Sequence, residues 1–128
     1  MSTIGHPLSD LVNLLMPYCF ATRGVSLYTT SGESFNEGST PGLPTQTQAM
    51  TWYQEVAGWD PAPVITWGEA FGMFRASCIM QGIAARYAAR QASSEKAKEH
   101  GEMYKSFGPF AWSVVQEADG KARSKEKL

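Results

Sequence analysis

Residues 65–91 show the longest helical periodicity in the sequence, and this segment limits the fold more than any other feature. Apolar and small residues repeat along it as two stripes, Trp67, Phe71, Phe74, Cys78 and Ala85 on one and Ala70, Met73, Ser77, Met80 and Ala84 on the other. A helix that is apolar over most of its circumference is typical of a central position, packed on several sides. Within it, Gly72 and Gly82 predict the close approach of a neighbouring backbone.

A first helix is expected from Leu8 to about Tyr18. Its apolar residues at helical spacing predict one buried face, formed by Leu11, Leu14 and Leu15. Pro17 is expected to end this helix early, because proline has no N–H to donate and its ring clashes with the preceding turn.

A second helix is expected to begin after Thr45 and to end at Gly58. Thr45 and Gln48 have the spacing of a capping box, and Gly58 can take the left-handed conformation that terminates a helix. The residues expected on its apolar face are Met50, Tyr53, Val56 and Ala57. The following segment, 59–63, contains two prolines and predicts a rigid, extended linker.

The remaining segments predict a charged helix over residues 95–104 and a last helix that begins with Pro109, after a break at Gly108. The last helix would bury Phe110, Ala111, Val114, Val115 and Ala118. Residues 20–43 predict one long irregular loop, pinned at intervals by Phe20, Val25, Leu27, Tyr28 and Phe35. No run of residues alternates as a strand does, so the fold class is predicted to be all-α, with four to five helices.

The chain has 128 residues, 43% hydrophobic and 18% charged, as in one globular domain, and its net charge of −1 disfavours a nucleic-acid-binding surface. Residues 121–128 carry four positive charges and one negative charge. They predict a solvated basic tail or a fraying helix end, so we divide the chain into a helical part, 1–119, and a tail, 120–128. No signal peptide and no membrane span is predicted, which favours a cytoplasmic protein and leaves an organellar location open.

The sequence contains no convincing catalytic or metal-binding constellation. His6 and His100 each lack a second ligand at usable spacing, so we predict no metal site and no catalytic residue. Cys19 and Cys78 match no metal or redox spacing and lie in apolar surroundings, which predicts two buried thiols.

Four polar residues have a structural interpretation and a functional one. Asp10 is either a first-turn acid favoured by the helix dipole or a buried anchor that accepts backbone N–H bonds from another loop. Glu69, Arg75 and Gln81 interrupt the apolar helix. Each of the three either lines a ligand cleft or finds a structural partner, because an isolated polar group is costly to bury.

The segment Gly5-His6-Pro7-Leu8-Ser9-Asp10-Leu11 resembles the Gly-Asp-Pro-x-x-Asp-Leu pattern of aminoglycoside-phosphotransferase and choline-kinase-like enzymes. The chain is most similar to the phosphotransferase domains associated with acyl-CoA dehydrogenases. The resemblance continues in three segments: 41–45, Trp52-Tyr53 with Gly58, and 71–75 through 79–83. It extends from Ser2 to about Val115.

The resemblance implies the C-terminal helical subdomain of a kinase-like fold, whose full-length enzymes use ATP and Mg²⁺ to phosphorylate a hydroxyl. The catalytic loop, the metal-binding Asp and the nucleotide lobe would precede Met1. Asp10 matches a residue that holds the catalytic loop from behind, and His6 replaces the Asp usual at its position. The chain would thus be a fragment or truncated homologue, inactive alone, that supplies the wall for a small hydroxylated acceptor. The dehydrogenase-associated type implies a hydroxylated acyl compound rather than an aminoglycoside.

A second hypothesis is a stand-alone helical interaction module without catalytic activity. A kinase-like lobe without its neighbour would expose apolar surface on the first and central helices, and such patches promote association. This hypothesis predicts a homodimer or a higher homo-oligomer that buries the exposed apolar face between copies.

Overall fold

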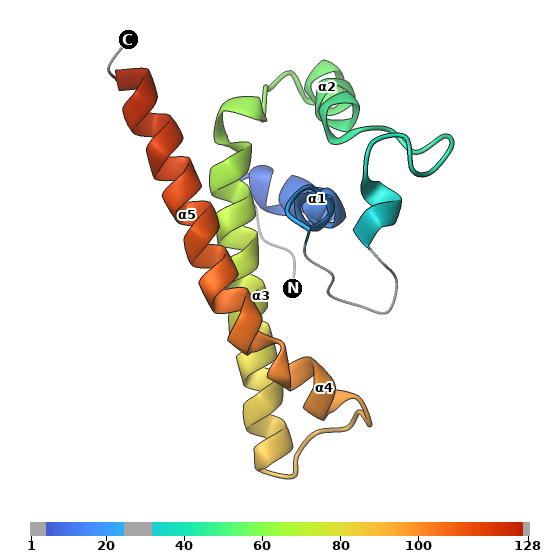
Figure 1. The fold of residues 1–128 in the computed structure, drawn as a ribbon, viewed down its shortest axis with the longest axis vertical. Coiled ribbons are helices and arrows are strands. Elements are labelled where there is room, and N and C mark those ends of the chain that lie inside the picture. Colours follow the sequence, from blue (N-terminus) through green and yellow to red (C-terminus); the bar gives the residue numbers. More distant parts are fainter. Residues whose placement is uncertain (1–4, 25–31, 127–128) are drawn as a thin grey trace. The chain divides into compact units, whose positions relative to one another are not determined.

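The computed structural model describes residues 5–24 and 32–126, and all the regular structure in these two ranges is helical (Figure 1). The elements are α1 (Leu8–Thr22), the 3₁₀ turn η1 (Gly32–Phe35), α2 (Gln46–Ala57), the 3₁₀ turn η2 (Ala62–Val64), α3 (Ile65–Ala88), α4 (Ala97–Glu102) and α5 (Tyr104–Glu126). The all-α prediction is therefore confirmed. The chain divides into two compact units, an N-terminal unit of residues 1–68 and a C-terminal unit of residues 69–128.

Helix α1 begins at Leu8, as predicted, but it does not end at Pro17. Pro17 lies inside the helix, which continues to Thr22. An interior proline costs a helix about 3 kcal/mol. Tyr18 and Cys19, which follow it directly, are both buried, and burying them requires the helix to continue. The expected end at Pro17 is wrong because packing outweighs local propensity.

The buried face of α1 is rotated from the predicted one. Its buried residues are Leu11, Val12, Leu15, Tyr18 and Cys19, whereas Leu14 is 71% exposed. Val12 also lies close to the start of α3, since a Cβ on Gly68 would lie 2.5 Å from a Val12 methyl carbon. The assignment of Leu14 to the core is therefore wrong.

Leu11, Leu15 and Tyr18 form the core of the N-terminal unit. Partly buried side chains from four other segments pack against this core: Phe35, Ala49, Met50, Tyr53, Trp59 and Ile65. The Tyr18 hydroxyl donates a 2.7 Å hydrogen bond to the backbone oxygen of Pro44, and its ring meets Phe35 edge-on at 5.2 Å between centroids. The predicted role of Phe35 in pinning the long loop is confirmed, while Val25, Leu27 and Tyr28 lie outside the described residues.

Helix α2 has the predicted ends. The Thr45 hydroxyl accepts from the Gln48 N–H, the Gln48 side chain accepts from the Thr45 N–H, and Gly58 ends the helix with φ of 67°. The predicted apolar face is partly wrong. Met50 and Tyr53 pack on the core, but Val56 is 92% exposed because its position lies on the outer side of the helix.

The predicted extended linker over residues 59–63 is also wrong in its second half. Pro61 is buried and has helical backbone angles, and the Asp60 carboxylate accepts from the Ala62 N–H at 2.9 Å. This side-chain bond starts η2, which leads directly into α3.

Helix α3 covers most of the predicted segment, but the large side chains on one of its faces are not packed. Glu69, Ala70 and Met73 are buried, whereas several large apolar residues are 48% to 61% exposed, namely Trp67, Phe71, Phe74 and Ile79. The expectation of a helix packed on several sides is therefore only partly correct, because one large apolar face stays exposed. The periodicity identified both stripes, but it did not distinguish a buried stripe from an exposed one.

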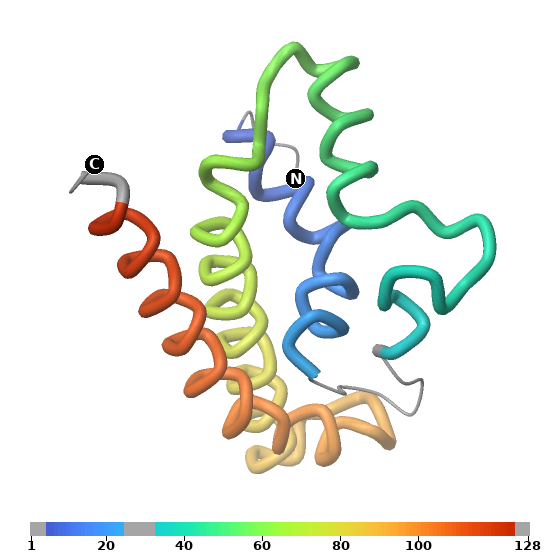
Figure 2. The backbone as a smooth tube through the Cα atoms, turned by 45° about the horizontal axis from the view of Figure 1, so that its top comes forward, coloured from blue at the N-terminus to red at the C-terminus, as the bar shows by residue number. Residues whose placement is uncertain are grey.

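In the C-terminal unit, the later part of α3 and α5 lie side by side (Figure 2). The buried residues of α5 follow one helical stripe, which consists of Phe107, Ala111, Val114 and Ala118. Pro109 lies inside this helix rather than at its start, so the predicted break at Gly108 is wrong. A continuous helix keeps Phe107 and Ala111 on the same face.

In the C-terminal unit, close approach to α3 occurs at Gly101 of α4 rather than at Gly82. A Cβ on Gly101 would lie 2.9 Å from the Ala84 Cα atom, whereas a Cβ on Gly82 would meet nothing within 4 Å. The prediction for Gly82 is therefore wrong. The glycine that the packing requires belongs to the short helix, and its neighbour is the small residue Ala84.

The predicted tail continues helix α5 as far as Glu126. Lys121 and Arg123 are exposed, and the Lys121 ammonium pairs with the Glu117 carboxylate at 2.5 Å, one helical turn earlier. Part of the positive charge in this region is therefore partnered within the helix, as is common on solvated helical surfaces.

Candidate functional site

The turn that precedes α1 is built around His6. The backbone N–H of Leu8 donates to Nδ1 of His6 at 3.2 Å, and the N–H of Ser9 donates to the His6 carbonyl at 3.1 Å. These bonds satisfy two of the N–H groups that a helix leaves free at its beginning. The N-cap residue Pro7 makes no side-chain cap, and the imidazole of the residue before it accepts from the first helical N–H instead.

Aromatic contacts hold the same turn against the rest of the N-terminal unit. The ring of His6 meets Trp59 edge-on at 5.2 Å, and Trp59 meets Tyr53 edge-on at 6.2 Å. Three rings therefore connect the beginning of α1, the segment before η2 and helix α2. Sequence reasoning assigned no role to His6, because ring contacts over such separations leave no local pattern in a single sequence.

Asp10 lies in the first turn of α1 and its side chain is exposed. Its backbone N–H donates to the Pro7 carbonyl at 3.2 Å. This position suits the structural interpretation, since a carboxylate in the first turn interacts favourably with the helix dipole. The expectation that Asp10 is buried is wrong, whereas its role as an anchor for a second loop stays a prediction.

The three polar residues of α3 do not line a common cleft. Glu69 is buried, Arg75 is half-buried and Gln81 is exposed. Successive members are six residues apart, so at about 100° per residue they point in three directions roughly 120° from one another. Glu69 and Arg75 each have an interaction partner. Any ligand-binding role would therefore belong to one of them rather than to the three as a group.

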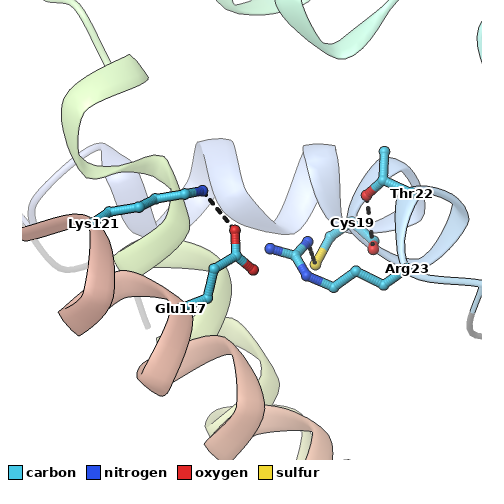
Figure 3. Close-up of polar contacts among 5 residues, drawn as sticks. All are labelled: Cys19, Thr22, Arg23, Glu117 and Lys121. Atoms are coloured by element: carbon cyan, nitrogen blue, oxygen red, sulfur yellow. Dashed lines mark hydrogen bonds and ion pairs between the residues drawn. The ribbon is translucent and has the colours of Figure 1, made fainter. Parts of the chain in front are cut away.

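The two cysteines differ in their surroundings. Cys19 is fully buried, and the Arg23 guanidinium donates to its Sγ at 3.1 Å, while the Thr22 hydroxyl donates to the Cys19 carbonyl at 3.2 Å (Figure 3). Cys78 lies exposed on α3. The prediction of two buried thiols is confirmed for Cys19 and wrong for Cys78.

In the part of the chain that the structure describes, the chemistry-bearing side chains do not gather into a metal centre. Over residues 5–24 and 32–126, no group of three or more His, Cys, Asp or Glu residues is arranged to hold a metal ion. His100 is half-buried in the last turn of α4, away from the His6 turn in the sequence.

The most extensive unusual feature is an exposed row of residues along α3, which we call the α3 seam. It consists of Trp67, Phe71, Phe74, Cys78, Gln81 and Ala85, all of which are exposed. Trp67 is 60% exposed and Phe74 is 61% exposed. Exposed apolar patches occur at protein–protein and membrane contacts and in ligand-binding grooves.

Comparison with known proteins gives one informative match. The chain is 28% identical over 115 residues to the mouse (Mus musculus) protein acyl-CoA dehydrogenase family member 10, and the match covers 90% of this chain. The chain spans only 10% of the length of that relative. No protein-family profile matches the chain, and no solved structure matches it. Across the part of the chain that the structure describes, no helix is both long and apolar enough to cross a membrane.

Proposed function

We propose that this chain is the helical, acceptor-side part of an ATP-dependent phosphotransferase of the aminoglycoside-phosphotransferase and choline-kinase-like type. The observation that carries the proposal is the match of 115 residues to acyl-CoA dehydrogenase family member 10. That name agrees with the resemblance of the Gly5–Leu11 turn to phosphotransferase domains associated with acyl-CoA dehydrogenases. The all-α fold is compatible with the helical part of a kinase-like lobe.

In this proposal the turn before α1 positions the catalytic segment of a longer polypeptide. The His6 ring and its Trp59 contact fix the turn, and the exposed carboxylate of Asp10 is available to accept backbone N–H bonds from that segment. Phosphoryl transfer depends on metal ions and on fixed donors around the transferred group. The described residues do not gather acidic side chains for a metal, so we assign no transfer step to this chain.

The proposal predicts that purified 1–128 does not turn over ATP. Mg²⁺-dependent release of ADP, measured with a coupled assay, should equal the rate without protein. A longer polypeptide, extended upstream along the reading frame, should carry a catalytic loop with an Asp-Trp-Glu-like segment and should consume ATP with a hydroxylated acyl acceptor. ATP consumption by 1–128 alone, or a stop codon immediately upstream of Met1, would contradict the proposal.

A pair of variants in the longer polypeptide tests the role of Asp10. Asp10→Ala should lower kcat at least tenfold, because the catalytic segment loses the carboxylate that positions it. Asp119→Ala, which removes an exposed carboxylate from α5, should leave kcat unchanged. Equal activity of the two variants would show that Asp10 serves only the helix dipole.

A specific observation also favours the second hypothesis, an interaction module. The α3 seam exposes three large aromatic rings in one row. Surface of this kind is unusual on a monomer and favours association with another apolar surface. The two hypotheses are compatible, since a subdomain that evolved within an enzyme can also associate through a surface outside the reaction site.

A further inference from the structure

The α3 seam has the spacing of a coiled-coil contact stripe. Its six positions are separated by four, three, four, three and four residues, which is the alternation of heptad a and d positions. The opposite side of the helix includes the buried Glu69. The seam therefore has the register of a helix-to-helix contact, but its six residues are exposed.

The larger side chains of the seam all lie in its first half. The first three positions are large aromatic residues, Trp67, Phe71 and Phe74. The last three are smaller, Cys78, Gln81 and Ala85. A parallel pair of such helices would place large residues against large ones and small against small. An antiparallel pair would place each large residue against a smaller one, which is how facing layers fill space.

We propose that two copies of this chain associate through an antiparallel pair of α3 helices, related by a two-fold axis that passes beside residue 76. Trp67 would then face Ala85 of the second copy, Phe71 would face Gln81, and Phe74 would face Cys78. All three pairings occur in a single register, and each joins an a position to a d position. The contact is isologous, as in most homodimers. The inference does not depend on the proposed phosphotransferase function.

The exposed area fits a reversible dimer. An aromatic side chain has about 150–250 Å² of surface, so three rings that are half to two-thirds exposed contribute roughly 350 Å² per copy. Two copies, with the smaller seam residues and Ile79 at the edge, reach about 1,000 Å². An interface of about 1,000 Å² lies at the lower limit for specific association, so we expect a weak, reversible dimer at micromolar concentrations.

The first test is the oligomeric state of 1–128 by sedimentation velocity between 1 and 200 μM. The wild-type chain should shift from monomer to dimer, and Phe74→Glu should raise the dissociation constant more than a hundredfold, because it places two carboxylates next to the two-fold axis. Val56→Glu, a matched change at an exposed position on α2, should leave the constant unchanged. A wild-type monomer at 200 μM, or equal effects of the two variants, would overturn the proposal.

A swap of side-chain size tests the register. Ala85→Trp should weaken the dimer at least tenfold, because the new ring would meet Trp67 of the second copy. The double variant Trp67→Ala with Ala85→Trp should restore dimerisation to within about threefold of wild type. Both positions are exposed, so circular dichroism should show that each variant is folded. Failure of the double variant to recover would contradict the antiparallel register.

A distance measurement separates the two helix directions. A spin label at Arg86→Cys, in a chain that also carries Cys78→Ser, lies ten residues from the proposed axis. Each residue adds 1.5 Å along a helix, so the two labels should be about 30 Å apart or more in the antiparallel pair. Labels in a parallel, in-register pair would be within about 20 Å. The shorter distance, or a protein other than a second copy covering the seam, would overturn the proposal.

Discussion

The ion pair between Glu102 and Lys105 is the described contact with the clearest consequence for titration. It joins the end of α4 to the beginning of α5 on the exposed surface of the C-terminal unit. The hydrogen bond from Lys105, together with its positive charge, lowers the pKa of the Glu102 carboxyl. The same bond raises the pKa of the Lys105 ammonium.

We predict that Lys105→Gln raises the pKa of the Glu102 carboxyl. Any stability that Glu102 contributes is present above the pKa of an unfolded glutamate and is lost as the pH falls through the lowered folded value. For Lys105, the contribution is present below the unfolded lysine pKa and is lost as the pH rises through the raised value. The carbon-13 chemical shift of the Glu102 carboxyl, followed from pH 2 to 7, measures the change.

Lys98→Gln is the matched control for this titration. Lys98 also lowers the pKa of Glu102, but its effect is the smallest of the causes and involves no hydrogen bond. Its removal should therefore change the titration midpoint less than the removal of Lys105. Because the pair is exposed, 1 M salt should reduce the difference between the two variants. Equal titration midpoints of Glu102 in wild type, Lys105→Gln and Lys98→Gln at low salt would refute the interaction between Glu102 and Lys105.

Residues that cap a helix were predictable from the sequence. Thr45, Gln48 and Gly58 form the predicted helix ends, because capping depends on neighbours three or four positions away. Leu14 and Val56 were wrongly placed on buried faces, because periodicity locates an apolar face but not which of its residues a neighbouring element covers. The contact between His6 and Trp59 joins residues far apart in the sequence, so no local rule could reveal it.

At the scale of elements, the two prolines expected to end or begin a helix both lie inside one. Pro17 and Pro109 are each flanked by buried residues on the same helical face. The burial of those residues on both sides offsets the lost backbone hydrogen bond. Proline therefore predicts a helix boundary well only where the following turn has no buried face of its own.

Glycine substitutions in helices separate close packing from intrinsic propensity. Gly101→Ala should destabilise the chain by about 1–3 kcal/mol, because the new methyl group would lie 2.9 Å from the Ala84 Cα atom. Gly82→Ala should stabilise it by about 0.5–1 kcal/mol, since a Cβ there meets nothing within 4 Å and alanine is the better helix former. Urea unfolding of the two variants measures both values. Stabilisation by Gly101→Ala would show that α4 does not approach α3 closely.

At the scale of the whole molecule, the sequence predicted the helical class but not which apolar stripe each helix buries. The two stripes of α3 have similar periodicity, and only the packing of α4 and α5 selects between them in the C-terminal unit. The selection leaves Phe71 and Phe74 exposed. Glu69, Arg75 and Gln81, which were proposed to line a cleft, point to separate sides of α3, because they follow one another at intervals of six residues.

Association through the α3 seam should make thermal stability depend on protein concentration. When a folded dimer unfolds to two monomers, raising the total concentration a hundredfold stabilises the dimer by about 2.7 kcal/mol. The two chains of the dimer, of 128 residues each, have a combined unfolding entropy of about 0.54 kcal/mol per kelvin, so the melting temperature of wild type should rise by about 5 °C between 5 and 500 μM. Differential scanning calorimetry measures this shift. Phe74→Glu should melt at one temperature across the range, and Val56→Glu should behave as wild type does, because only the first variant removes a ring from the seam.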